Sequence, residues 1–198
     1  MTEHHLLETF QSTYRQHHST ETALLRVQND ILCALDSQCT VLHLIIVLSA
    51  VFDTVDHQIL LQRLETCFGL SGNVLHWFTS YLNCRQQCVS LKYVKSETQG
   101  LLWGVPQGSV LGPILFSLYV SPLADVIHKH LVNYHMYADD VQIYISFKPD
   151  TSSPAIEALQ NCVSDILQWM YCNKLKLNDG KTDVILFGRK SQVSLLPL

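Results

Sequence analysis

The spacing of hydrophobic residues changes several times along the chain, and each spacing predicts an element. Ser19-Thr20-Glu21 is typical of a helix start, and the residues after it predict an amphipathic helix. Its apolar positions recur on one face: Leu24, Val27, Ile31 and Leu35. Residues 41–48 are β-branched and almost wholly apolar, which predicts a strand buried on both faces.

Two helices and a hairpin are predicted after that strand. The helices are indicated by two apolar stripes, and Ser71 is a good cap for the second. The stripes are Ile59, Leu60 and Leu64, then Val74, Trp77, Phe78 and Tyr81. Residues 85–102 alternate around Lys95-Ser96-Glu97, which predicts a β-hairpin.

The second half begins with a tight loop, Gly104-Val105-Pro106-Gln107-Gly108, which is incompatible with a helix interior. An apolar helix is predicted from about Ser109 to Val126, and strands at 134–138 and 141–147 flank a tight turn. Ser153-Pro154 predicts the start of another helix, and Val184–Phe187 a last strand. Helices that alternate with mostly antiparallel strands predict an α+β fold, with a sheet covered by helices on one face.

Composition narrows the class of protein. The 198 residues fit one large domain, or one domain with a small annex, and 47% apolar residues allow a real core. No apolar run is long enough to span a membrane, and the N-terminus lacks the pattern of a secretory signal. With seven cysteines that lack zinc-ligand spacing, we expect reduced thiols in an intracellular, cytoplasmic or nuclear protein that is not secreted. A net charge of −4 argues against a surface that binds nucleic acid everywhere, but not against an acidic catalytic core.

Asp139-Asp140 is the most informative pair of polar residues. Two adjacent acids between apolar strands are costly unless a cation neutralises them. Hard oxygen ligands at a strand turn suit magnesium, and two such ions held close together stabilise phosphoryl transfer. An exposed Asp-Asp turn without metal is the common alternative, and the dipeptide alone does not exclude it.

Five motifs in order resemble the reverse transcriptases of non-LTR retrotransposons, the long interspersed element type. They are Arg15–Ala23, Leu48–His57, Gly104–Pro113, Tyr137-Ala138-Asp139-Asp140 and 169–188, which includes Leu177–Thr182. The resemblance runs from about Phe10 to Gly188. It implies the palm of a right-hand polymerase, with a ferredoxin-like antiparallel sheet and partial fingers. The expected division is partial fingers and a lead-in helix in 1–40, palm in 41–190 and a tail in 191–198.

The resemblance also implies roles for particular residues. Asp139, as principal ligand, and Asp140 would hold Mg²⁺, two ions in the family. Phe52 would lie under the incoming sugar, although an ordinary core phenylalanine fits equally well. Gln107 and the Gly108 backbone would lie along the nucleotide and template base.

Three basic residues receive expected contacts. Lys181 would approach the pyrophosphate as a proton donor or charge stabiliser, although a solvated loop lysine is an equal alternative. Arg15 and Arg85 are candidates for phosphate contact. The implied partners are an RNA template, a DNA primer and deoxynucleotides, with no membrane; the sequence leaves the oligomeric state open.

One position departs from the family pattern. Two residues before Ser49-Ala50, where the family carries an aspartate that bridges both metals, this chain has Val47. Valine offers no ligand, which puts the second ion in doubt. Asp53 lies six residues on, and at ~3.3 Å per residue it is too far along to replace that acid. Asp56 lies further still.

Two functional hypotheses therefore stay open. The first is an RNA-directed DNA polymerase domain with two-metal nucleotidyl transfer, impaired by Val47. The second is an inactive retrotransposon remnant that at most binds nucleic acid or a partner protein. A two-metal nuclease has less support, because the sequence shows no further carboxylate cluster.

Overall fold

A computed structural model describes residues 8–189 of the protein as two compact units. The first comprises Met1–Ser49 and Val120–Leu198, of which 8–49 and 120–189 are described, and the second comprises Ala50–Tyr119. The expected division into fingers (1–40) and palm (41–190) stays a prediction, and the predicted tail, 191–198, lies outside the described residues.

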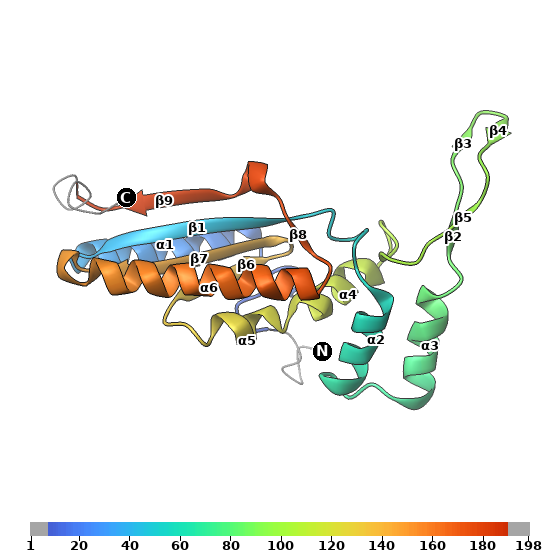
Figure 1. The fold of residues 1–198 in the computed structure, drawn as a ribbon, viewed down its shortest axis with the longest axis horizontal. Helices are drawn as coiled ribbons and strands as arrows, with labels where there is room; N and C mark the ends of the chain where they lie inside the picture. The colour runs from blue at the N-terminus through green and yellow to red at the C-terminus, as the bar shows by residue number, and fades with distance from the viewer. Residues whose placement is uncertain (1–7, 190–198) are drawn as a thin grey trace. The chain divides into compact units, whose positions relative to one another are not determined.

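The first unit is built on an antiparallel sheet with β1 (Thr40–Ser49) at its centre (Figure 1). On one side β1 pairs with β7 (Asp140–Phe147), which pairs with β6 (Asn133–Tyr137). On its other side β1 pairs with β9 (Asp183–Phe187) and with the short β8 (Lys176–Leu177). Only Ile45 and Ser49 of β1 are less than fully buried, which confirms the predicted doubly buried strand.

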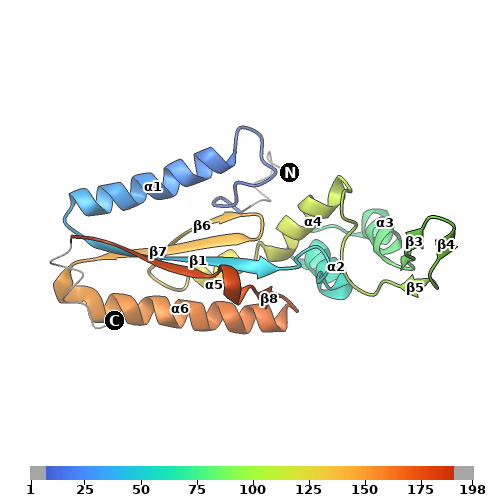
Figure 2. The same ribbon diagram turned by 90° about the horizontal axis from the view of Figure 1, so that it is seen from above.

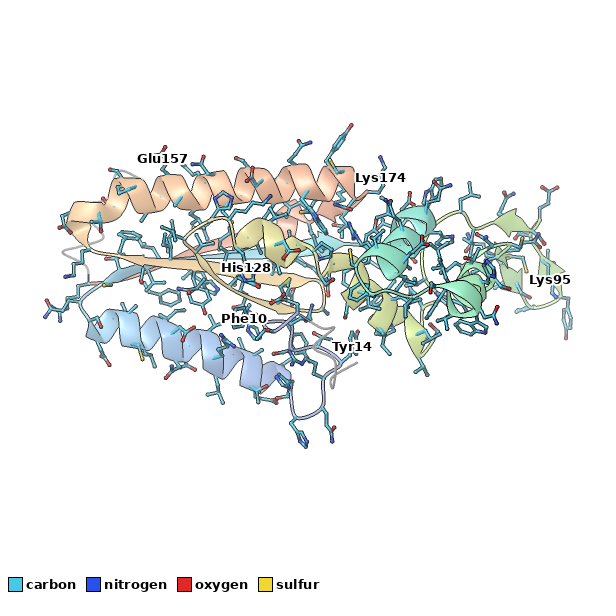
Figure 3. The ribbon with its side chains drawn as sticks, turned by 90° about the horizontal axis from the view of Figure 1, so that it is seen from below. Phe10, Tyr14, Lys95, His128, Glu157 and Lys174 are labelled. Atoms are coloured by element: carbon cyan, nitrogen blue, oxygen red, sulfur yellow. The ribbon has the colours of Figure 1, made fainter. Side chains whose placement is uncertain are left out.

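Helices cover both faces of this sheet, as the views along its edge show (Figures 2 and 3). On one face α1 (Thr20–Asp36) packs Val27 and Ile31 against Val41 and Tyr144. The other face is covered by α6 (Ser152–Cys172), with α5 (Leu123–Ile127) beside it. The α+β class is confirmed, but the expectation of helices on one face only is wrong. The α1 helix, from the lead-in segment, covers the face opposite α6, because β1 carries apolar residues to both faces of the sheet.

The first turns of α1 and α6 show how far the predicted helix starts are correct. Ser19 Oγ accepts from the Thr22 backbone N–H, and Thr22 Oγ1 accepts from that of Ser19, so the predicted cap of α1 is confirmed. The last helix begins at Ser152 after a 3-10 turn, η2 (Pro149–Thr151), rather than at Ser153-Pro154. Proline fits in the first turn because its missing N–H has no intrahelical partner there.

The second unit begins with two helices. Asp56 Oδ1 accepts from the Gln58 and Ile59 backbone N–H groups and caps α2 (His57–Thr66), which buries Leu60 and Leu64. Ser71 precedes α3 (Gly72–Leu82) but makes no side-chain cap bond. The predicted stripe of α3 is not buried: only Leu82 is, and Val74 and Trp77 are exposed.

The predicted hairpin is confirmed, with its turn in a different place. β2 (Gln86–Gln87) pairs with β5 (Gln99–Gly100), and β3 (Ser90–Leu91) pairs with β4 (Val94–Lys95). The turn is therefore Lys92-Tyr93 rather than Lys95-Ser96-Glu97.

The helix predicted over 109–126 is two helices, α4 (Leu111–Val120) and α5. The break falls at Pro122, because proline has no backbone N–H to continue the ladder. Among the helices of residues 8–189, none is long and apolar enough to cross a membrane.

Candidate active site

The two aspartates lie at the tight turn between β6 and β7. Tyr137 pairs with Asp140, so the turn itself is Ala138-Asp139, and Ala138 has a φ of 55°. The Leu48 backbone N–H donates to the Asp139 carbonyl at 3.0 Å, which fixes the turn to β1. Both carboxylates are half-buried at the end of the sheet.

The electrostatics of this turn favour a cation. Burial, and then the neighbouring Asp139, raise the pKa of Asp140, while Lys181 lowers it. Asp139 thus opposes the ionisation of Asp140, as a neighbouring carboxylate does. A positive ion between them would remove that cost.

Val47 is the direct cross-strand partner of Asp140. Directly opposed residues of antiparallel strands have Cβ atoms about 4.5–5.5 Å apart on the same face of the sheet. Val47 is 9% exposed. The position from which the resemblance expects a third acid is therefore beside Asp140, and the structure places a methyl-bearing side chain there.

Lys181 reaches the same end of the sheet through a short loop. The Asn178 backbone N–H donates to the Val47 carbonyl at 2.8 Å, and the Lys181 backbone N–H donates to the Asn178 carbonyl at 3.0 Å. Lys181 ends the 3-10 turn η3 (Asp179–Lys181) and is exposed. Its positive charge lowers the pKa of Asp140.

Two residues of this site escaped sequence reasoning, Gln11 and Tyr14. Gln11 is buried, and its Oε1 accepts from the backbone N–H groups of Ala138 and Thr13, both at 3.2 Å. Burial, and then Asp139, raise the pKa of Tyr14. The segment that carries them runs along β6, with Gln11 bridged to Met136. No periodicity in residues 8–15 marks this pairing.

Arg15 is engaged by its own segment. Its Nη1 donates to the carbonyls of Glu8, Thr9 and Gln11, at 3.1, 3.0 and 3.3 Å. These contacts hold together the loop that supports the aspartate turn. Contact with a phosphate stays a prediction for Arg15.

In the second unit, the loop Gly104–Gly108 is clamped to the segment after Ala50. The Val105 backbone N–H donates to the Phe52 carbonyl at 2.7 Å, and that of Gly104 donates to Val55 at 2.8 Å. Gly104 has a φ of 88°, and a Cβ there would lie 2.9 Å from the Phe52 carbonyl oxygen. Only glycine fits this approach without a shift of the backbone.

The Phe52 ring is half-buried against Phe116, with ring centroids 5.6 Å apart. One part of the ring thus belongs to the core and another part stays accessible. Both readings of Phe52 made from the sequence are compatible with this position.

Gln107 is held by an acid. Its Nε2 donates to Asp53 Oδ1 at 2.9 Å, and both side chains are exposed. They line a cavity of about 740 Å³ together with Arg85, Gln87 and Trp103. Sequence reasoning placed Gln107 and Arg85 at the substrate but did not foresee Trp103 or the role of Asp53.

Comparison with known proteins identifies the family of the chain. The family model for reverse transcriptase (RNA-dependent DNA polymerase) matches residues 1–196. The chain belongs to this family.

Relatives of this reverse transcriptase chain are mobile-element proteins of Drosophila. The chain is 30% identical over 187 residues to the probable RNA-directed DNA polymerase from transposon BS of Drosophila melanogaster. It is 28% identical over 188 residues to the RNA-directed DNA polymerase from mobile element jockey of the same species. Each match covers 92% of this chain and 20% of the relative, so the chain spans about a fifth of their length.

Solved structures share the fold at low identity. Telomerase from Candida albicans superposes with a TM-score of 0.66 at 15% identity, over 85% of this chain and 30% of that one. Apo telomerase from Candida tropicalis, truncated from its C-terminal domain, superposes with a TM-score of 0.63 at 17% identity, over 91% of this chain and 37% of that one. These findings confirm the α+β fold and the membership in the reverse transcriptase family, with mobile-element proteins among the relatives.

The aspartate turn offers two carboxylates to a divalent metal ion, with valine at position 47. Mg²⁺ binds through one or two carboxylates, together with waters and phosphate oxygens. Asp139 and Asp140 can provide the carboxylates. Within residues 8–189, no group of three or more His, Cys, Asp or Glu side chains is placed to hold a metal. A second ion lacks a protein ligand at Val47.

Proposed function

We propose that the chain is the palm-containing part of a retrotransposon RNA-directed DNA polymerase whose nucleotidyl transfer is impaired by Val47. The family match supports the activity class. The observation that supports the impairment is the pairing of Val47 with Asp140, because it puts an apolar side chain where the third carboxylate is needed.

The remaining groups keep recognisable tasks in this proposal. Asp139 and Asp140 hold a magnesium ion, which when bound neutralises charge on the transferring phosphate. Lys181, whose charge lowers the pKa of Asp140, stabilises or protonates the pyrophosphate leaving group. Without a carboxylate at position 47, residues 8–189 offer no third acid at this turn that would hold a second ion.

Substrate recognition is assigned to the second unit. Phe52 presents the accessible part of its ring to the sugar of a deoxynucleotide, and Gln107 lies along the nucleotide and template base. Arg85 contacts a phosphate from the wall of the same cavity as Gln107. The template is RNA and the primer is DNA, by membership in the family.

The seven cysteines of the chain are free, which supports a reducing intracellular compartment as the place of action. A cytoplasmic or nuclear location stays a prediction.

The alternative is an inactive remnant that retains only binding. Arg15 favours it, since Nη1 of the guanidinium expected at a phosphate donates to three carbonyls of its own segment. In that case Val47 is one of several changes that abolish the polymerase activity, and Val47→Asp alone does not restore it.

Primer extension on an RNA template with Mg²⁺ separates the two proposals. The unaltered chain is compared with Val47→Asp and with Val47→Asp plus Asp139→Ala. We expect extension by Val47→Asp alone, at least about a hundredfold above the others, since removing one essential electrostatic group costs about that much. Extension by the unaltered chain would disprove the role of Val47, and no extension by any variant would favour the remnant.

A further inference from the structure

The hairpin of the second unit buries none of its residues. From Gln86 to Gly100 every position is exposed. Two ladders of two residue pairs each hold the strands together. Figure 1 shows the hairpin extending away from α2 and α3 of its own unit. A segment that contributes nothing to a core is free to contact something else.

The charge of this segment is opposite to that of the chain. Lys92 and Lys95 stand against Glu97, a formal charge of +1, whereas the whole chain carries −4. Within the described part of the chain, no carboxylate forms an ion pair with these two lysines. Cations without acidic partners on an acidic protein are available to an external anion.

The tip adds an aromatic ring to these charges. Tyr93 is 101% exposed, so both faces of its ring are open. It shares the two-residue turn with Lys92, and the pairing of Ser90 with Lys95 puts the second lysine just behind that turn. Figure 3 shows Lys95 at this outer end of the hairpin.

The other side of the hairpin is apolar, with exposed Val89, Leu91 and Val94. This strip alone would suit a protein partner. The lysines argue otherwise, because the buried parts of protein–protein interfaces are depleted in lysine. An open aromatic ring between unpaired cations is instead the combination that binds single-stranded nucleic acid.

We propose that the hairpin tip binds an unpaired nucleic-acid strand. The Tyr93 ring stacks on a base, and Lys92 and Lys95 contact the flanking phosphates. The inference rests on the proposed function for the origin of that strand, the template or the primer. It uses neither the aspartate turn nor Val47.

The test is fluorescence anisotropy with labelled single-stranded RNA and DNA of about a dozen nucleotides, over a series of salt concentrations. Tyr93→Ala should weaken binding about tenfold, the loss of one stacked base. Lys92→Gln with Lys95→Gln should lower the slope of log affinity against log salt by about 1.4, two phosphate contacts.

Matched controls come from another exposed tyrosine–lysine pair. Tyr171 is 76% exposed, and the Lys174 Nζ lies 6.0 Å from its ring centroid. Tyr171→Ala, and Lys174→Gln with Lys129→Gln, make the same chemical changes in the first unit. We expect both controls to bind like the unaltered chain, and circular dichroism checks that every variant is folded.

The inference is wrong if the unaltered chain does not bind, or if the hairpin variants bind as the controls do. It is also wrong if the hairpin contacts protein instead of nucleic acid. In that case Leu91→Ser with Val94→Ser abolishes self-association in light scattering, while the Tyr93 variant binds nucleic acid normally. Primer extension by Val47→Asp is scored separately. Extension without a hairpin effect overturns this inference alone, and weakened binding without extension overturns the proposed function alone.

Discussion

Val47 and Asp140 face each other across two strands, with Asp139 at the adjoining turn and Lys181 nearby. Because residue 47 is valine, this end of the sheet has no third carboxylate at that position. Three acids around one point would repel each other strongly unless cations were present. Stability without metal and metal-dependent catalysis therefore make opposite demands on residue 47.

This conflict can be measured. Val47→Asp should lower the free energy of unfolding by about 2 kcal/mol or more without metal, because it buries a charge at a 9% exposed position. Added Mg²⁺ should restore part of that loss by binding the folded state. Urea unfolding with and without Mg²⁺ checks this.

Val47→Asn is the control, since it has nearly the shape of aspartate without the charge. It should be destabilised as well but respond to Mg²⁺ no more than the unaltered chain does. An equal response of both variants would mean that position 47 does not reach the ion.

At the scale of elements, local signals located the helices and strands well. The β-branched run gave β1, the serine cap gave α1, and the glycine-bounded loop lies where it was expected. Among the details that were wrong, two have different causes. The apolar composition of residues 109–126 predicts one helix, but Pro122 divides it into two. The hairpin turn lies at Lys92-Tyr93 because the strand register, and not the polarity of the residues, sets its position.

Two serines that look alike in sequence provide a test at this scale. Ser19 makes a reciprocal cap with Thr22, whereas Ser71 makes no side-chain cap bond. Ser19→Ala should cost about 1 kcal/mol of stability, and Ser71→Ala less than about 0.5 kcal/mol. Urea unfolding followed by circular dichroism compares them, and equal costs would contradict the capping geometry.

At the scale of the whole molecule, the face of the sheet under α1 carries buried polar groups. His135 accepts from or donates to Ser12 Oγ at 2.9 Å, and His43 contacts Gln142 Oε1 at 3.1 Å. Burial, and then the charges of Arg26 and His18, lower the pKa of His135 to about 4 from its ordinary 6.5. Burial also lowers the pKa of His43.

These histidines should make the fold sensitive to mild acid. A base with a lowered folded pKa stabilises the fold above its unfolded pKa, and that contribution is lost as pH falls from 6.5 towards 4. We expect a loss of about 1 to 2 kcal/mol between pH 7 and pH 5. Urea unfolding at both pH values measures it, and His135→Asn should reduce the loss. A variant with the same loss would mean that other groups titrate.

The sequence by itself determined most of the elements, the α+β class and the location of the aspartate turn. Hydrophobic periods, caps and turn residues act over a few neighbouring positions, so they are legible in one chain. The tertiary structure alone decided that Val47 faces Asp140, that Gln11 supports the turn, and that Asp53 holds Gln107. Those relations depend on strand register and on contacts between distant segments, which burial of the whole sheet selects and no local pattern encodes.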